Sequence, residues 1–512
     1  MAPRVSVDQD PFADPSSFDE LRQPHADATL VVSRHASLSL GTDSLIVLDD
    51  TIADRDGSKC CGLASADSKT TRAIPYFNVL WADLFKFDLT IRHATPTSKN
   101  VVRVSYLHFP VDKTDRRTVT AWIDRLLGRA YNASLRRKRV KVLINPFGGK
   151  GSAQKWYLSE IEPIFTAARC ELDIQRTQAR GHAIEIAEQL DVDKYDVVAC
   201  CSGDGVPYEV FNGFGRRKDA RNALARVAVV QLPCGTGNAM SLNLNGTDSP
   251  SLAALCVVKG LQTPLDLISI TQGDRRTLSF LSQSLGIVAE SDLGTENLRW
   301  MGSARFTYGV LVRLLRQAVY PCDIAVKVVA SDKGAIRDRY RQEITNQTPA
   351  GQRRGNLSLL GNNGASDDGQ GLPPLEFGTV MDELPTGWDL VPHDTLGSFF
   401  AGNMAWVAPD TDFFPAALPN DGCLDLVRLD GGISRLKSLN SLTAVANNTF
   451  FDLSYVSYQK LAGYRIIPKS KGDGYISIDG ERVPFEPFQA EVHQGLGTVL
   501  SKNGHTYEAP GV

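Results

Sequence analysis

Three short apolar segments of the chain each lead directly into a polar segment that contains several glycines. Four or five consecutive apolar residues bounded by glycine are typical of strands buried on both faces of a parallel sheet. Between them, the pattern predicts helices over residues 153–169 and 180–190 and a strand near residues 172–174. This alternation predicts βαβ units. The apolar segments and their polar continuations are residues 140–144 and 145–152, 197–201 and 202–213, and 227–230 and 233–238.

The region before these units has a different pattern. Short alternating segments followed by a helical one predict a small β-rich module over residues 29–135. Residues 1–28 are rich in Asp, Pro and Ser and are predicted to be disordered. The predicted elements of the module are strands at residues 44–48, 74–81 and 101–106 and a helix at residues 118–128.

Beyond residue 265 the chain becomes rich in segments that predict antiparallel strands, for example at residues 265–269 and 424–427. This region is interrupted by sequence rich in Gly, Asn, Gln and Asp. Such composition cannot bury enough apolar surface to offset the entropy of ordering the chain. We therefore predict a disordered insertion at residues 345–374.

The glycine-rich segments that follow the strands suit phosphate groups. Glycine lets main-chain N–H groups approach phosphate oxygens, and a helix start beyond the loop adds a favourable partial charge. The spacing around Lys150 differs from that of a Walker loop, and no segment has the Gly-x-Gly-x-x-Gly pattern. Taken alone, Gly203-Asp204-Gly205 is also ordinary turn chemistry. The three segments together favour a nucleotide-binding site of another kind.

Several motifs, in the right order, resemble a family of lipid kinases. The loops Asn145-Pro-Phe-Gly-Gly-Lys-Gly151, Ser202-Gly-Asp-Gly205 with Glu209 and Asn212-Gly213, and Gly235-Thr-Gly-Asn238 resemble the catalytic domain shared by diacylglycerol, ceramide and sphingosine kinases. Later segments resemble the block that sets sphingosine kinases apart and the closing segment of that family. These are residues 284–292 with Glu296, residues 299–302 with Arg305 and Phe306, and residues 478–481 with Gln489 and His493.

The resemblance implies a two-domain catalytic core. An α/β nucleotide-binding domain with a parallel, phosphofructokinase-like sheet spans residues 136–265, and an antiparallel β-sandwich that binds lipid spans residues 266–512. The implied activity is transfer of the γ-phosphate of ATP to the primary hydroxyl of a sphingoid long-chain base, which gives the 1-phosphate. Two alternatives stay open: a ceramide or diacylglycerol kinase, and a catalytically dead scaffold recruited to membranes. The intact glycine loops argue against the scaffold.

The resemblance also implies roles for individual residues. Asp204 takes the proton from the attacking hydroxyl in this hypothesis, and magnesium binding by the same carboxylate is the alternative. Asp292 binds the cationic amine of the base, with Ser284 and Glu296 nearby; from sequence alone, a helix cap is the alternative for Asp292. ATP and Mg²⁺ are the implied cofactors, and the metal ligands are not identified. The implied nucleotide-binding residues are Asn145, Phe147, Gly148, Gly149, Lys150, Gly151, Thr177, Arg180, Ser202, Gly203, Gly205, Glu209, Gly235, Thr236, Gly237, Arg299, Arg305, Asp479, Gly480 and Glu481.

Composition agrees with a large enzyme. The chain of 512 residues is long enough for two or three domains, and its 42% hydrophobic content is typical of globular proteins. A net charge of −3 argues against nucleic-acid binding. The basic run at residues 136–139, with Lys141, is a solvated face or linker, a contact for an anionic membrane surface, or a nuclear signal. No signal peptide and no apolar run of about 18 residues is present, so we expect a cytoplasmic protein.

The cysteines add one prediction about membranes. All nine lack metal-ligand spacing, which predicts free thiols in a reducing compartment. Cys60 and Cys61 lie in a polar segment beside Lys59 and are candidates for acylation; two unmodified surface thiols are the alternative. The expected partners are ATP, a sphingoid-base lipid and, peripherally, a membrane. A homodimer stays open.

Overall fold

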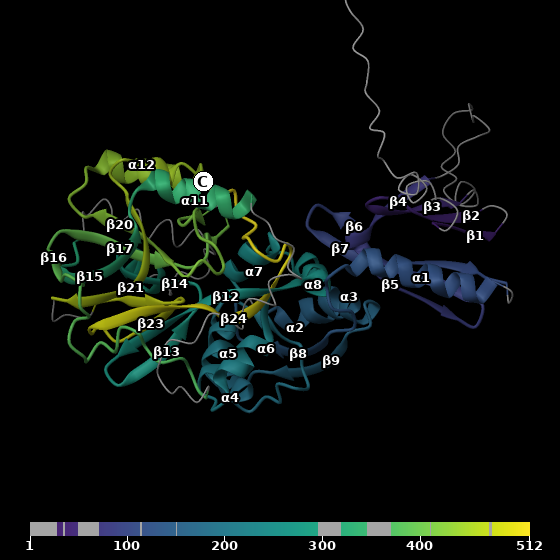
Figure 1. Cartoon of the computed structure of the whole chain (residues 1–512), viewed down its shortest axis with the longest axis horizontal. Coiled ribbons are helices and arrows are strands. Elements are labelled where there is room, and N and C mark those ends of the chain that lie inside the picture. Colours follow the sequence, from purple (N-terminus) through teal and green to yellow (C-terminus); the bar gives the residue numbers. More distant parts are fainter. Residues whose placement is uncertain are drawn as a thin grey trace, which may run out of the picture. The chain divides into compact units, whose positions relative to one another are not determined.

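The computed structural model of the chain describes residues 28–33, 36–49, 71–112, 115–149, 151–294, 319–345, 370–409, 411–469 and 474–512. They belong to two compact units, Met1–Thr95 with Val104–Asn132 and Pro96–Arg103 with Ala133–Val512. Figure 1 labels most of the helices and strands of each unit. The predicted N-terminal tail up to residue 27 and the pair Cys60 and Cys61 lie outside the described residues.

The first unit contains two antiparallel sheets and a helix, which confirms the predicted β-rich module. Helix α1 buries Trp122 and Leu126, and the Tyr131 hydroxyl donates a hydrogen bond to the Leu80 carbonyl (2.5 Å). The single strand predicted at residues 74–81 is wrong, because a 3₁₀ turn at Tyr76–Asn78 follows Pro75, which has no N–H for a strand ladder. The elements are β1 (Thr29–Ser33), β2 (Ala36–Leu40), β3 (Ser44–Asp49) and β4 (Thr71–Pro75) in one sheet, β5 (Val79–Phe85), β6 (Asp88–Ser98) and β7 (Val101–Pro110) in the other, and α1 (Arg116–Tyr131).

The second unit begins with the predicted parallel sheet. Its strands lie in the order β9-β8-β10-β11, and the central strand β10 is buried at every position. From β8 the chain continues to β9 on one side of the sheet and then crosses to β10 on the other side of β8. The strand order therefore changes direction between β8 and β10. Such a reversal is the point where open α/β sheets bind ligands. The strands are β8 (Arg139–Ile144), β9 (Glu171–Arg176), β10 (Val197–Ser202) and β11 (Ala228–Pro233).

Helices connect these strands and form two packed groups. Helices α4, α5 and α6 contact one another, and α3 contacts α8, as expected for the two faces of such a sheet. Helix α8 begins at Pro250, where the Ser249 hydroxyl caps the Leu252 N–H (3.3 Å). The bounds are α2 (Ala153–Trp156), a π-helical turn (Tyr157–Ile161), α3 (Glu162–Ala167), α4 (His182–Glu188), α5 (Gly205–Gly215), α6 (Ala220–Arg226), α7 (Ala239–Asn245) and α8 (Pro250–Lys259).

The strands after residue 260 are antiparallel, as predicted. Strand β24 pairs with β21 and β12, and at Val499 it also pairs with β11 of the parallel sheet. Most of the antiparallel strands therefore continue the parallel sheet, whereas β18 and β19 form a separate two-stranded sheet. The strands are β12 (Leu261–Gln272), β13 (Arg275–Ser279), β14 (Ser282–Gly286), β15 (Cys322–Ala330), β16 (Val391–His393), β17 (Leu396–Gly402), β18 (Trp406–Ala408), β19 (Thr411–Asp412), β20 (Leu424–Asp430), β21 (Ser457–Pro468), β22 (Ile476–Ile478), β23 (Glu481–Val483) and β24 (Phe488–Ser501).

The helices of this region are α9 (Ile287–Leu293), α11 (Lys333–Thr345) and α12 (Arg435–Ala446). Helix α11 ends where the predicted disordered insertion begins, and residues 346–369 of that insertion lie outside the described residues. The last residues of the predicted insertion are ordered. Gly371 donates a hydrogen bond to the Lys218 carbonyl (2.5 Å), and Arg221 donates one to the Gln370 carbonyl (2.8 Å). The insertion predicted at residues 345–374 is therefore too long at its C-terminal end.

Two further expectations concern membranes and thiols. No helix among the described residues is both long and apolar enough to cross a membrane. The seven cysteines within the described ranges are free, as predicted.

Candidate active site

The glycine-rich loops start at one edge of the parallel sheet. Ile144 lies opposite both Cys201 and Arg176, and Ser202 lies opposite Pro233, so the four parallel strands end at the same level. The loops that follow them are residues 145–151, 177–181, 203–204 and 234–238. The register of the strands thus brings together loops that are up to about 90 residues apart in the sequence, as expected for the carboxyl edge of such a sheet.

The main chains of these loops touch. A Cβ atom at position 235 would lie 2.4 Å from the Gly203 Cα, so only glycine allows this approach. A Cβ at position 149 would lie 3.2 Å from the Cys234 carbonyl oxygen. The loops at residues 145–151 and 203–204 therefore both contact the loop at residues 234–238.

Asp204 lies at the centre of this arrangement. It precedes α5, and its carboxylate accepts hydrogen bonds from the Ala239 N–H (3.0 Å), the Met240 N–H (2.9 Å) and the Gln231 side-chain amide (3.2 Å). Burial raises the pKa of Asp204 above its ordinary value, and the main-chain donors oppose that shift. The carboxylate therefore fixes the start of α7 relative to the start of α5.

One oxygen of Asp204 can accept a further proton donor. Oδ1 accepts hydrogen bonds from Met240 and Gln231, and Oδ2 accepts one from Ala239; the Asn238 N–H is a further main-chain donor to the carboxylate. A carboxylate oxygen has two lone pairs. A Cβ at position 237 would lie 2.9 Å from Oδ2, so glycine at this position keeps that side of the carboxylate open. A hydroxyl group could therefore reach Oδ2 from the direction of Gly237.

Residues of the loops at 145–151 and 177–181 differ in how far they are exposed. The Asn145 side-chain oxygen accepts a hydrogen bond from the Phe147 N–H (3.0 Å), and Phe147 is 70% exposed. Thr177 is buried and its N–H donates to the Ile144 carbonyl (2.9 Å). These contacts shape the loops and leave Phe147 accessible to a ligand. Lys150 lies outside the described residues.

Glu209 holds a helix start. Its two oxygens accept hydrogen bonds from the Gly181 N–H (2.8 Å) and the Ala183 N–H (3.1 Å) at the beginning of α4, and its pKa is raised, chiefly by burial. The adjacent Arg180 side chain is 76% exposed and forms an ion pair with Glu481. Glu209 thus positions the segment that carries Arg180.

The segment 479–481 joins the site from the far end of the sequence. Asp479 and Gly480 form the turn between β22 and β23, both with positive φ. A Cβ at position 205 would lie 3.4 Å from the Glu481 carboxylate, which places Glu481 beside the start of α5. Asp479 is buried, and burial raises its pKa to about 6. It anchors the turn through hydrogen bonds from the Ser279 hydroxyl and from the N–H groups of Phe280, Leu281 and Ser282.

The predicted substrate residues lie on β14 and α9. Ser284 is buried on β14, opposite Phe400 and Ser477. Asp292 belongs to the last turn of α9. The helix that the sequence predicts after it lies outside the described residues, so the helix-cap alternative stays a prediction. The residues Glu296, Arg299 and Arg305 lie outside the described residues.

Gln489 and His493, which belong to the closing segment, support another part of the fold. The Gln489 amide donates to the carbonyls of Phe377 (3.0 Å) and Gly378 (2.9 Å) and so fixes the loop before β16 on β24. The His493 ring contacts the Ser269 hydroxyl (2.8 Å) and Arg276 (3.2 Å). Burial, and secondarily Arg276, lowers the pKa of His493 to about 4.

Sequence reasoning missed Gln231. This residue is buried on β11, where its side-chain oxygen accepts a hydrogen bond from the Ser241 N–H (2.9 Å) while its amide donates to Asp204. A glutamine within the apolar run of β11 is the signal that could have identified it, because a buried polar side chain needs partners.

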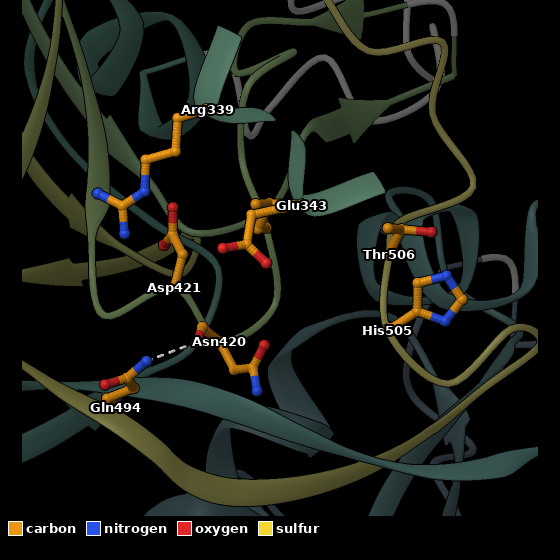
Figure 2. Close-up of a pocket in the computed structure, with 8 residues that line it drawn as sticks. Arg339, Glu343, Asn420, Asp421, Gln494, His505 and Thr506 are labelled. Carbon is orange, nitrogen blue, oxygen red and sulfur yellow. Dashed lines mark hydrogen bonds between the residues drawn. The ribbon is translucent and has the colours of Figure 1, made fainter. Parts of the chain in front are cut away.

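A cavity of about 200 Å³ lies elsewhere in the second unit (Figure 2). Its lining comes from α11, from the segment before β20, from β24 and from the last residues of the chain. It contains none of the loop residues described above, so it is separate from the candidate active site. The residues that line it are Arg339, Glu343, Leu418, Asn420, Asp421, Gln494, His505 and Thr506.

Two family models match the chain. The model described as the diacylglycerol kinase catalytic domain matches residues 139–270. A model described as a domain of unknown function matches residues 28–132. The first match covers the parallel sheet and all three glycine-rich loops.

Curated proteins are similar over most of the chain. Sphingoid long chain base kinase 5 of Saccharomyces cerevisiae is 36% identical over 425 residues, which cover 75% of this chain and 62% of the yeast protein. Sphingoid long chain base kinase 4 of Schizosaccharomyces pombe is 33% identical over 452 residues, covering 86% of this chain and 90% of that protein. Human sphingosine kinase 1 is 28% identical over 375 residues, covering 71% of this chain and 91% of that protein.

The contact between Gly203 and Gly235 generates a stability prediction. We expect Gly235→Ala to lower the free energy of unfolding by about 2 kcal/mol, because its Cβ would overlap the Gly203 main chain and separate the loops. Gly203→Ala is the matched control, since a Cβ there would lie 3.5 Å from the Gly235 Cα, an ordinary contact. Denaturant unfolding of both variants measures the difference, and equal losses would contradict it.

The pKa of His493 generates a pH prediction. Its value of about 4 in the folded chain lies below the ordinary 6.5, so the unfolded state binds more protons between these pH values. The free energy of unfolding should therefore fall by up to about 3 kcal/mol as the pH drops from 6.5 to 4. We expect His493→Gln to reduce this slope in denaturant unfolding, and a slope that the substitution leaves unchanged would contradict the prediction.

Proposed function

The chain belongs to the sphingoid long chain base kinases, and on that premise we propose that it transfers the γ-phosphoryl group of ATP to the primary hydroxyl of a sphingoid long-chain base. The observation that carries this proposal is the convergence of three glycine-rich loops on the buried carboxylate of Asp204. Phosphoryl transfer leaves the protein two main tasks, which are to position the reactants and to neutralise charge. Loops of main-chain N–H groups around one carboxylate suit both tasks.

The nucleotide phosphates bind, in this proposal, to the N–H groups of residues 148–151 and 235–237 and to the Thr236 hydroxyl. The close approach of Gly149 to Cys234 and Gly235 supports a single phosphate site shared by the two loops. Arg180, which is exposed and adjacent to α4, adds positive charge at this edge. Arg299 and Arg305 remain candidates to contact the phosphates from the following segment.

Asp204 acts as the base in this mechanism. Its Oδ2 accepts the proton of the substrate hydroxyl as the oxygen attacks the γ-phosphorus, and ADP leaves. Burial raises the pKa of Asp204, which makes the carboxylate a stronger base than an exposed aspartate. The hydrogen bonds from Ala239 and Met240 hold it in place during the transfer.

Magnesium is the second proposed cofactor. Among the described residues, no group of three or more His, Cys, Asp or Glu side chains could hold a metal ion alone. This fits Mg²⁺ in phosphoryl transfer, because the ion takes most of its oxygen ligands from phosphate and water and few from protein. Glu481, beside the start of α5, is the carboxylate that would hold it, and it would neutralise charge on the phosphates.

Asp292 is proposed to determine the class of lipid. A carboxylate pairs with the cationic amine of a sphingoid base and finds no such partner in diacylglycerol or in ceramide, whose nitrogen is acylated. Ser284 and Glu296 are proposed to bind the same polar head. A ceramide or diacylglycerol kinase is the alternative enzyme, and it requires that Asp292 have another role.

We expect the purified chain, with ATP and magnesium, to phosphorylate dihydrosphingosine and neither ceramide nor diacylglycerol. Asp204→Asn should reduce kcat at least a hundredfold, because removing a general base costs that much. Asp193→Asn, at an exposed carboxylate, is the matched control and should retain full transfer. Transfer chiefly to diacylglycerol would contradict the role of Asp292, and transfer to none would favour an inactive scaffold.

The pKa of Asp204 generates a second prediction about transfer. Because protonated Asp204 cannot accept a proton, kcat/KM should fall as the pH drops through the pKa of this group, which burial places above the ordinary aspartate value of about 4. A pH–rate profile on dihydrosphingosine measures this acidic limb. A profile that is flat down to about pH 4 would remove Asp204 from the role of base.

A further inference from the structure

Two phenylalanines of the first unit are exposed at the end of one hairpin. Phe85 ends β5 and is 72% exposed, and Phe87 precedes β6 and is 42% exposed. Phe85 lies opposite Asp88, so Lys86 and Phe87 form a two-residue turn. We call the segment Phe85-Lys86-Phe87 the hairpin tip. Leaving two phenyl rings in contact with water forgoes a large hydrophobic gain, which calls for an explanation.

The turn itself does not favour this sequence. Lys86 has a φ of 56°, in the left-handed region that residues with a side chain seldom adopt. Two-residue hairpin turns that need a positive φ at their first position strongly favour glycine, asparagine or aspartate. Lysine and phenylalanine at these two positions thus help neither the turn nor the core. A conflict between local preference and structure is expected where residues serve a function.

The charges around the tip leave a positive side chain beside the rings. Asp83 forms an ion pair with Arg92 (3.0 Å), and Asp88 lies 3.4 Å from the His108 ring nitrogen. The Lys86 ammonium lies 5.7 Å from the centre of the Phe85 ring. The two acidic side chains of the hairpin end are therefore engaged with cationic or imidazole groups. Lys86 adds a positive charge to an aromatic surface.

Neighbouring residues extend and fix this surface. Tyr106 of β7 is 55% exposed and stacks on His108, with ring centres 6.1 Å apart. Because His108 contacts Asp88, which lies opposite Phe85, the stacked pair belongs to the same face as Phe85. The Val111 N–H donates a hydrogen bond to the Phe87 carbonyl (2.7 Å), which holds the tip against the chain that follows β7.

We propose that the hairpin tip is a membrane-contact element, which inserts the rings of Phe85 and Phe87 into the interface of a bilayer with anionic lipids. Aromatic side chains favour the level of the lipid headgroups, and a lysine there extends its ammonium towards the phosphates. Two rings on a narrow turn cover far less than the roughly 800 Å² that each partner of a stable protein complex buries. The tip therefore suits insertion into lipid better than a protein interface.

Binding of the full chain to lipid vesicles tests the proposal. We expect sedimentation with vesicles of phosphatidylcholine and phosphatidylserine, and at least tenfold weaker binding for Phe85→Ser/Phe87→Ser. Val31→Ser is the matched control, because Val31 is 70% exposed on β1 of the same unit and lies outside the hairpin tip; it should bind like wild type. Equal binding of the double variant and wild type would overturn the proposal, as would no binding by wild type.

Three further variants distinguish insertion of the rings from an indirect effect of the double substitution on binding. Phe85→Trp should shift its fluorescence to shorter wavelength when vesicles are added, whereas Val31→Trp should not. Lys86→Glu should weaken binding to vesicles that contain phosphatidylserine more than binding to phosphatidylcholine alone. If the chain binds vesicles but the tryptophan at position 85 shows no shift, the contact lies elsewhere and the proposal fails. Neither readout depends on transfer activity, so these results are independent of the proposed function.

Discussion

The close approach of the Gly203 and Gly235 main chains is the constraint on which the candidate active site depends. It follows from the register of β10 and β11, whose last residues lie opposite each other. Only at this separation can Asp204, one residue beyond the contact, accept hydrogen bonds from the start of α7. Helix α7 in turn carries Asn243, which exchanges two hydrogen bonds with the main chain of Trp406 on β18 (2.8 and 2.9 Å). The contact between the two glycines is thus connected to the antiparallel part of the unit through the Asp204 carboxylate and helix α7.

Strand β24 provides a second connection between the parallel and antiparallel strands. Its first residues pair with β21, β12 pairs along most of its length, and Val499 reaches β11. Polar side chains on this strand, Gln489 and Glu491, accept or donate hydrogen bonds that fix residues 376–378. The strand therefore combines a structural role with a place in the segment that resembles lipid kinases. Residues of such a segment need not contact a ligand, and His493 and Gln489 illustrate this point.

The sequence predicted the features that depend on local pattern. The parallel strands, the glycine-rich loops after them and helix α1 were predicted, because apolar runs and glycine are local signals. The position of Glu481 beside Gly205 could be expected only from the resemblance, since nothing local to residue 481 encodes a partner nearly 300 residues away. The continuity of the sheet through β24 was missed for the same reason, because strand pairing is a property of distant segments. The prediction of a single strand at residues 74–81 was wrong, because the apolar pattern does not indicate that the strand ends at Pro75.

Two buried aspartates near the loops show how surroundings separate a structural from a chemical role. Asp479 receives four hydrogen bonds from one turn, three of them at the same oxygen, and its side chain is enclosed on all sides. Asp204 is less enclosed than Asp479, and its Oδ2, which accepts from Ala239, faces a glycine that leaves the approach open. Burial raises the pKa of both carboxyl groups, so a raised pKa alone does not distinguish them. The lone pairs that are still free to accept a proton distinguish the two groups, because a base needs an unoccupied lone pair in the direction of its substrate. This criterion supports the proposal that Asp204 takes part in proton transfer, whereas Asp479 holds the late segment in place.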